Sequence, residues 1–195
     1  MNLEDTVQMA EKVPGWMSRE ELRWLAKTAR ELEGPAAWLE IGCFAGRSTL
    51  AVGLSLPLDS ILVVIDQFDN SYPALGSGLD PEDSCIVRFF ETMRFLADQR
   101  PDVKVIVLPG KSERYRLGVA PSVFDVAFID GDHSRAAVAS DCETCQGLLI
   151  PEGRLCGHDY HADWPDVKSV VDERYGLAVK VIEGTSIWTV TAPWG

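Results

Sequence analysis

With 195 residues, 46% of them hydrophobic and 25% charged, the chain has the balance of one globular domain, residues 1–195, with a sizeable core. Its formal net charge of −12 repels phosphate backbones, so we expect no direct binding to nucleic acid. No apolar run is long enough to predict a membrane span, and the start "MNLEDTVQMAEKVPGW" lacks the basic and apolar parts of a signal peptide. We therefore expect a cytoplasmic protein that does not bind membranes.

The first predicted element is a helix that begins after Ser18. Ser18 and Glu21 form the pattern of a capping box, and an apolar face follows at helical spacing: Leu22, Leu25, Ala26, Ala29 and Leu32. We expect residues 1–34 to be a helical extension of the domain. Trp24 lies off the apolar face, and an exposed tryptophan is typical of a partner surface or a lid. Together with Trp16 it allows a homodimer.

After this helix, strands and helices alternate five times. Strands are predicted over 36–42, 60–66, 103–108, 124–130 and 153–160, and helices over 47–56, 82–100, 134–149 and 164–175. A closing hairpin, 177–183 and 186–192, turns at Gly184 and Thr185. This rhythm predicts an α/β fold, a Rossmann-like three-layer sandwich whose seven-stranded, mostly parallel sheet ends in an antiparallel hairpin.

Cys142 and Cys145 form a C-x-x-C pattern, which is compatible with zinc or redox chemistry. On the predicted helix over 134–149 they share a face with Val138 and Leu149. No second C-x-x-C is present to complete a zinc site. We interpret the two cysteines as small core residues.

The first predicted strand ends in a glycine-containing turn, "LEIGCFAGRST". Gly42 and Gly46 allow a ligand to approach the backbone, and the following helix offers free N–H groups at its start. The next strand ends in Asp66, whose carboxylate can accept hydrogen bonds from both ribose hydroxyls of a nucleoside. An ordinary βα turn and an ordinary strand-end acid are the alternatives, but the combination favours a nucleoside ligand at the carboxyl ends of the strands.

Two acidic patches, "AFIDGDHS" and "GHDYH", follow the fourth and fifth strands and hold all three histidines. Asp130 and Asp159 should lie close together there, and two close carboxylates raise each other's pKa unless a cation lies between them. Hard oxygen ligands suit Mg²⁺ or Ca²⁺. As alternatives, Asp130 accepts hydrogen bonds from the next turn, Asp132 is a helix N-terminal acid, and His158 is a buried, hydrogen-bonded histidine.

From Trp38 to Tyr160, four segments resemble the successive motifs of class I S-adenosylmethionine-dependent methyltransferases: "WLEIGCFAGRSTL", "VVIDQFD", "FDVAFIDGDHSRAAVASD" and "LLIPEGRLCGHDY". The subgroup with "IDGDHS" and "HDY" segments, which is related to O-methyltransferases of sugars and natural products, is the most similar in appearance. The resemblance implies S-adenosylmethionine as cofactor and a small-molecule acceptor, such as a sugar or a natural product.

The resemblance also implies roles for single residues. The methionine part of the cofactor would be held by Glu40, Gly42, Cys43, Gly46 and Ser48. Asp66 would bind the ribose, Gln67 and Phe68 would flank the adenine, and Lys111 and Ser112 would contact its edge. An acidic residue is common in the family where this chain has Lys111.

For catalysis, the resemblance implies that Asp130 lies nearest the sulfonium methyl group. A metal-dependent enzyme would hold Mg²⁺ or another divalent cation between Asp130 and Asp159. His133 is the candidate base and His158 the second candidate, because an unperturbed histidine has a pKa near 6.5. Related metal sites usually add a third carboxylate or an asparagine, which is missing beside Asp159. A metal-free site with His133, or a borderline metal with imidazole ligands, therefore stays open.

Other functions remain compatible with the sequence. A module that binds S-adenosylmethionine without transferring its methyl group would keep Asp66 and lose the acceptor site. An NAD-dependent oxidoreductase is disfavoured by the G-x-x-x-G turn and by the closing hairpin. Tyr72 and Trp164 lie in segments that could line an acceptor pocket, although Trp164 also suits an anchor for its own helix.

Overall fold

The computed structural model describes residues 1–69, 76–80, 82–115 and 123–191; Tyr72 lies outside this part of the chain. The strands are β1 (Ala37–Ile41), β2 (Ile61–Asp66), β3 (Lys104–Pro109), β4 (Phe124–Ile129), β5 (Leu149–Gly157), β6 (Lys180–Val181) and β7 (Trp188–Thr191). The helices are α1 (Leu3–Ala10), α2 (Arg19–Arg30), α3 (Arg47–Gly53), α4 (Cys85–Gln99), α5 (Arg135–Leu148) and α6 (Pro165–Tyr175), with short 3₁₀ turns at Ser112–Arg114 and Gly176–Ala178.

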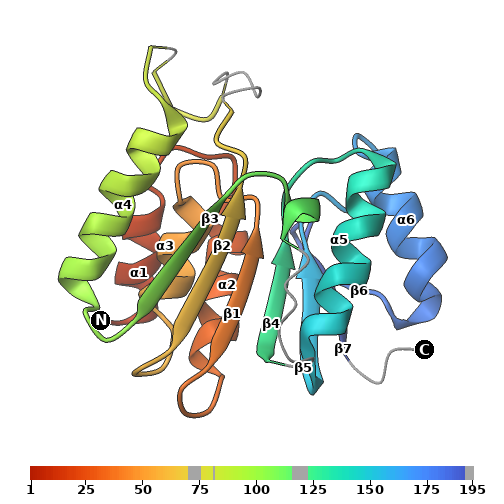
Figure 1. Ribbon diagram of the computed structural model, residues 1–195, viewed down its shortest axis with the longest axis horizontal. Helices are drawn as coiled ribbons and strands as arrows, with labels where there is room; N and C mark the ends of the chain where they lie inside the picture. Colours follow the sequence, from red (N-terminus) through yellow and green to blue (C-terminus); the bar gives the residue numbers. More distant parts are fainter. Residues whose placement is uncertain (70–75, 81, 116–122, 192–195) are drawn as a thin grey trace.

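The seven strands form one sheet in the order β3-β2-β1-β4-β5-β7-β6. The first five in the chain are parallel, and β7 joins β5 in the antiparallel direction. Helices α1 to α4 cover one face and α5 and α6 the other (Figure 1). Alternate residues of β1 show why both faces are apolar: Trp38 packs under α1 to α4, whereas Leu39 packs under α5. The predicted α/β sandwich is confirmed.

The strand order reverses at β1, which pairs with β2 on one side and β4 on the other. The loops that follow β1 and β4 diverge at such a point and leave room for a ligand. Gly42 makes this geometry possible. Its φ of +84° favours glycine, and a Cβ there would lie 2.0 Å from the carbonyl oxygen of Asp130.

Several predicted boundaries are wrong; α3, for example, ends at Gly53 and not at residue 56, and α4 begins at Cys85 and not at residue 82. β5 starts at Leu149 and ends at Gly157, so the predicted turn before residue 153 lies inside the strand, where the register with β4 shifts. β6 is only two residues long because a 3₁₀ turn occupies 176–178. The hairpin turn is longer than predicted: residues 183–186 separate Ile182 from Ile187, whose carbonyl oxygen accepts from the Ile182 N–H at 2.9 Å.

Side-chain burial tests two further expectations. All five cysteines are free and buried, and Cys142 and Cys145 lie in the core under α5 as predicted. Trp24 is half-buried and packs against the core, contrary to prediction, whereas Trp16 is 48% exposed. Among the described residues, no helix combines the length and the apolar character that a membrane crossing would need.

Candidate functional site

A cavity of about 480 Å³ lies beyond the carboxyl ends of β1, β2, β3 and β4. Its walls come from the loops after these strands, from the chain before α2, and from one face of α5. Most of the predicted site residues line it: Gly42, Cys43, Ser48, Asp66, Gln67, Phe68, Lys111, Ser112, Asp130, His133, His158 and Asp159. The structure thus brings together residues from five separate segments of the sequence. Glu40 and Gly46 are not part of the wall.

Glu40 lies fully buried beneath the glycine turn. Its carboxylate accepts hydrogen bonds from the hydroxyls of Ser48 and of Thr49, the latter at 2.7 Å, so it fixes the first turn of α3. Burial raises the pKa of Glu40 to about 8, although these two hydrogen bonds oppose the shift. Gly46 begins α3 with a φ of +88° and faces Phe89. Contact of Glu40 or Gly46 with a cofactor stays a prediction.

Asp66 organises the loops around it. Its Oδ2 accepts from the N–H groups of Cys43 at 2.7 Å and Phe44 at 2.9 Å, and its Oδ1 accepts from the N–H of Phe68 at 2.7 Å. A carboxylate has about four acceptor positions, so about one remains for a ligand. Asp66 therefore holds the glycine turn in place, and its contact with the ribose hydroxyls of a cofactor stays a prediction.

Asp141 of α5 is a cavity residue that the sequence reasoning missed. Its side chain is 2% exposed, and its Oδ1 accepts from the Ser112 hydroxyl at 2.5 Å. Burial raises the pKa of Asp141 to about 6 against the effect of that hydrogen bond. The sequence does contain a signal for it: Asp141 lies four residues after Ala137, so the two share the inward face of the predicted helix, where an acid is unusual.

The two acidic patches meet because β4 and β5 end in register. Ile129 pairs with Gly157, so Asp130 and His158 follow as neighbours. His158 Nδ1 lies 3.4 Å from Asp130 Oδ1 and 3.2 Å from Asp159 Oδ1. The predicted proximity of the two carboxylates is confirmed.

His133 completes this cluster. Its Nε2 lies 2.8 Å from Asp159 Oδ2, and its ring packs on that of Trp164 at a tilt of 30°, with centroids 4.0 Å apart. One donor atom each from Asp130, His133 and Asp159 lie within 4.8 Å of one another, which is close enough to share a metal ion. Asp132 is the predicted helix N-terminal acid: it accepts from the Ser134 N–H at 2.8 Å, which lowers the pKa of its carboxyl.

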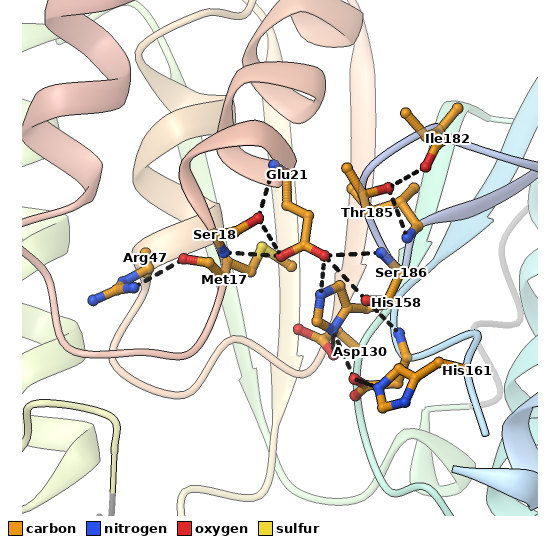
Figure 2. Close-up of polar contacts among 12 residues, drawn as sticks. Met17, Ser18, Glu21, Arg47, Asp130, His158, His161, Ile182, Thr185 and Ser186 are labelled. Carbon is orange, nitrogen blue, oxygen red and sulfur yellow. Dashed lines mark hydrogen bonds and ion pairs between the residues drawn. The ribbon is translucent and has the colours of Figure 1, made fainter. Parts of the chain in front are cut away.

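Glu21 of α2 is the second residue that the sequence reasoning missed. Its Oε1 lies 3.1 Å from His158 Nε2 and accepts from the Ser186 N–H at 3.0 Å, while its Oε2 accepts from the Ser18 N–H at 2.8 Å (Figure 2). The predicted capping box is therefore present, and one of its members also reaches the cavity residue His158.

Both ring nitrogens of His158 thus face carboxylates. Burial opposes a charge on the ring, but Asp130, Asp159 and Glu21 together raise the pKa of His158 to about 12. A protonated imidazole has no lone pair to accept a proton. We therefore assign His158 an electrostatic role and keep His133 as the candidate base.

Arg47 of α3 fixes the chain segment before α2 as a wall of the cavity. Its guanidinium donates to the carbonyl oxygens of Val13 at 2.6 Å and Met17 at 2.9 Å. Trp16, in this segment, packs on Phe44 with ring centroids 4.8 Å apart. The N-terminal extension therefore contributes both a wall and a charged side chain to the site.

Known structures share this architecture. An O-methyltransferase from Bacillus cereus in complex with S-adenosylhomocysteine aligns with a TM-score of 0.65 and 16% identity over 97% of this chain and 90% of that one. The O-methyltransferase TomG from Streptomyces achromogenes, involved in tomaymycin synthesis and solved with S-adenosylmethionine, gives 0.62 and 19% over 99% and 89%. A methyltransferase from Podospora anserina, bound to S-adenosylhomocysteine, gives 0.62 and 19% over 99% and 87%.

At these identities the structural likeness shows the fold alone. No curated protein matches the chain significantly. The sequence pattern of a family described as a methyltransferase domain matches residues 39–160, which is more than half of the chain and contains the loops after β1, β2, β3 and β4 and the start of the loop after β5. The chain therefore belongs to the methyltransferase-domain family, as the resemblance of its motifs to class I methyltransferases implies.

Proposed function

We propose that the protein transfers a methyl group from S-adenosylmethionine to a hydroxyl oxygen of a small molecule, such as a sugar or a natural product. One observation carries the proposal: a single cavity joins the glycine turn and Asp66 to the cluster of Asp130, His133 and Asp159. The former group suits a nucleoside cofactor, and the latter suits the activation of a hydroxyl group. The O-methyltransferases that share the fold support the same assignment.

Methyl transfer is an in-line displacement in which an acceptor oxygen attacks the methyl carbon while the carbon–sulfur bond breaks. It needs alignment of the three atoms and the loss of one proton. His133 would take that proton. Asp159 and Trp164 hold the His133 ring in one orientation, and the carboxylate stabilises the imidazolium that forms. Asp130 and the charged His158 border the same space.

As an alternative to a metal-free site in which His133 is the base, a divalent cation would fit the donor set of Asp130, His133 and Asp159. Two carboxylates and an imidazole suit Mn²⁺, Fe²⁺ or Zn²⁺ better than Mg²⁺, which prefers oxygen ligands alone. Such an ion would lower the pKa of an acceptor hydroxyl. The protonated His158 already lies beside both carboxylates and partly neutralises them. A bound ion would therefore share Asp130 and Asp159 with that positive charge.

The first test is calorimetric titration of the protein with S-adenosylhomocysteine, with Mg²⁺ or Mn²⁺ and again with EDTA. Micromolar binding supports the cofactor assignment, and no binding under either condition refutes it. Asp159→Asn should abolish ion binding and leave S-adenosylhomocysteine bound. If the parent protein binds no divalent ion, the metal proposal fails while the cofactor proposal stands.

Turnover separates the enzyme from a binding module. Release of S-adenosylhomocysteine should depend on the addition of a hydroxylated acceptor, and a panel of sugars and phenols would identify its class. A protein that binds the cofactor but methylates no member of the panel behaves as a binding module. Tight binding of NADH in place of S-adenosylhomocysteine would instead identify an oxidoreductase.

The cellular location and the partners of the protein are also proposals. We propose a cytoplasmic location, which the five free thiols support, since reducing compartments keep cysteines unpaired. The charge of −12 supports the absence of nucleic-acid partners. The exposed Trp16 supports a homodimer, which sedimentation would test.

A further inference from the structure

Trp164 is an unusual residue for the place that it occupies in the fold. It is the N-cap of α6, with Pro165 in the first turn, and its side chain makes no capping hydrogen bond. Serine, threonine, aspartate and asparagine are preferred at an N-cap, because their side chains accept from the free N–H groups of the helix start. Helix formation therefore does not explain the tryptophan, and residues that break a local rule are expected at functional sites.

Burial in the core does not explain the indole ring of Trp164 either. The residue is 37% exposed and lies on the wall of the cavity. Part of the ring packs on His133, and hydrogen bonds fix the backbone that carries it. The Trp164 N–H donates to the carbonyl oxygen of His161 at 3.2 Å, and its own carbonyl oxygen accepts from the Lys168 N–H at 3.2 Å. A flat, apolar and well-anchored surface therefore borders the cavity.

The position of Trp164 indicates which part of a bound ligand it meets. Under the proposed function, on which this inference rests, the cofactor lies at the glycine turn and at Asp66. In-line transfer places the acceptor oxygen beyond the methyl group, at the cluster of Asp130, His133 and Asp159. Because Trp164 packs directly on His133, the rest of the acceptor lies within reach of the indole. We propose that the acceptor contains a ring, aromatic or sugar, whose face packs on Trp164 while its hydroxyl group lies at the cluster.

This contact would make Trp164 a specificity-determining residue. Aromatic rings pack on one another over their faces, and the C–H groups on one face of a pyranose ring form a similarly flat, apolar surface. An open-chain polyol has no such face, and a small ring covers less of the indole than a large one. The contribution of ring stacking corresponds to about a tenfold preference for the acceptor with the larger or the closed ring.

The experiment compares acceptors that share the reacting group and differ in the face that they offer to Trp164. The aromatic pair is phenol and naphthol, and the sugar pair is sorbitol and methyl glucopyranoside. Release of S-adenosylhomocysteine gives kcat/KM for each acceptor. In each pair that the parent protein methylates, it should favour naphthol over phenol, or the glucopyranoside over sorbitol, by about tenfold. The pair that is methylated shows whether the ring is aromatic or a sugar.

Trp164→Leu should lower this preference to about threefold or less, because leucine keeps apolar bulk without a flat face, and Trp164→Phe should keep most of it. A disturbed His133 ring would lower both kcat/KM values of a pair alike, so their ratio separates contact with the acceptor from positioning of the base. Trp16→Leu is the matched control: Trp16 also lines the cavity but packs on Phe44 at the glycine turn, so the ratio of the parent should persist.

Equal kcat/KM values within a methylated pair overturn the proposal, as does a Trp164→Leu variant that keeps the ratio of the parent. The variant should bind S-adenosylhomocysteine with the affinity of the parent in calorimetry; a loss of about tenfold would place the ring in the cofactor site and overturn the proposal too. Should Trp164→Leu fail to fold, Trp164→Ser replaces it, because serine is a favoured N-cap, with the same expected loss of preference. A protein that binds S-adenosylhomocysteine but methylates neither pair refutes the proposed function itself, and this inference with it.

Discussion

The contact between Glu21 and His158 should contribute strongly to stability, and Glu21→Gln tests this. The glutamine keeps the size of the side chain and its ability to cap α2, but it removes the charge that faces a protonated, buried imidazole. Glu21 is 6% exposed, so solvent screens the interaction little. Removal of one partner of a buried ion pair typically costs about 3–5 kcal/mol. Because Asp130 and Asp159 still neutralise His158, we expect a value at the lower end, about 3 kcal/mol.

Urea denaturation at neutral pH, followed by far-ultraviolet circular dichroism, would measure this loss in the free energy of unfolding. For a domain of this size it corresponds to a decrease in melting temperature of about 6–12 °C. Glu20→Gln is the control: it lies next to Glu21 in the same first turn but is exposed, so we expect a change of about 0.5 kcal/mol or less. If Glu21→Gln lowers the free energy of unfolding no more than the control does, the ion pair between Glu21 and His158 contributes nothing to stability, and the reasoning is refuted.

Three more predictions follow from the site. Gly42→Ala should abolish S-adenosylhomocysteine binding, because its Cβ would collide with the Asp130 carbonyl; Gly34→Ala, at φ +62° with open space around it, should cost about 1 kcal/mol and leave calorimetric binding intact. The pKa of His158 is raised to about 12, so its stabilising effect is full below about pH 6.5 and declines above it. The parent protein should then lose more unfolding free energy between about pH 6 and about pH 9 than His158→Gln, and equal losses would contradict this. His133→Asn should lower turnover about 10²-fold or more with S-adenosylhomocysteine affinity unchanged, whereas unchanged turnover would remove His133 as the base.

Local sequence patterns were sufficient to predict the strands of the sheet and the loops that carry the candidate site. Runs such as "ILVVID" are β-branched and buried on both faces, so their periodicity and length identify them as parallel strands. Because the carboxyl ends of such strands meet at one edge, the residues that end or follow them, such as Asp66 and Asp130, could be placed in one cavity.

The sequence did not predict the site contacts of Glu21 and Asp141, because each residue also has an ordinary local explanation. Glu21 is fully explained by the capping box with Ser18, and nothing near it in sequence indicates a partner in His158. Asp141 resembles any polar residue on an amphipathic helix until Ser112 is placed against it. The charge of His158 follows from three carboxylates on three different segments, so it could be obtained only from their positions in space.

The contacts of Glu21 with His158 and with Ser186 have a consequence for protein engineering. Glu21 and Ser186, which meet behind the imidazole, both lie outside the stretch that matches the family, residues 39–160. The wall held by Arg47 also lies outside it. A chimera that grafts only the matched stretch onto a relative would carry the glycine turn, His133 and His158 with Asp130 and Asp159, but it would leave Glu21, the third carboxylate that faces His158, behind. The smallest transplantable unit for this chemistry therefore reaches from before α2 to the strand β7.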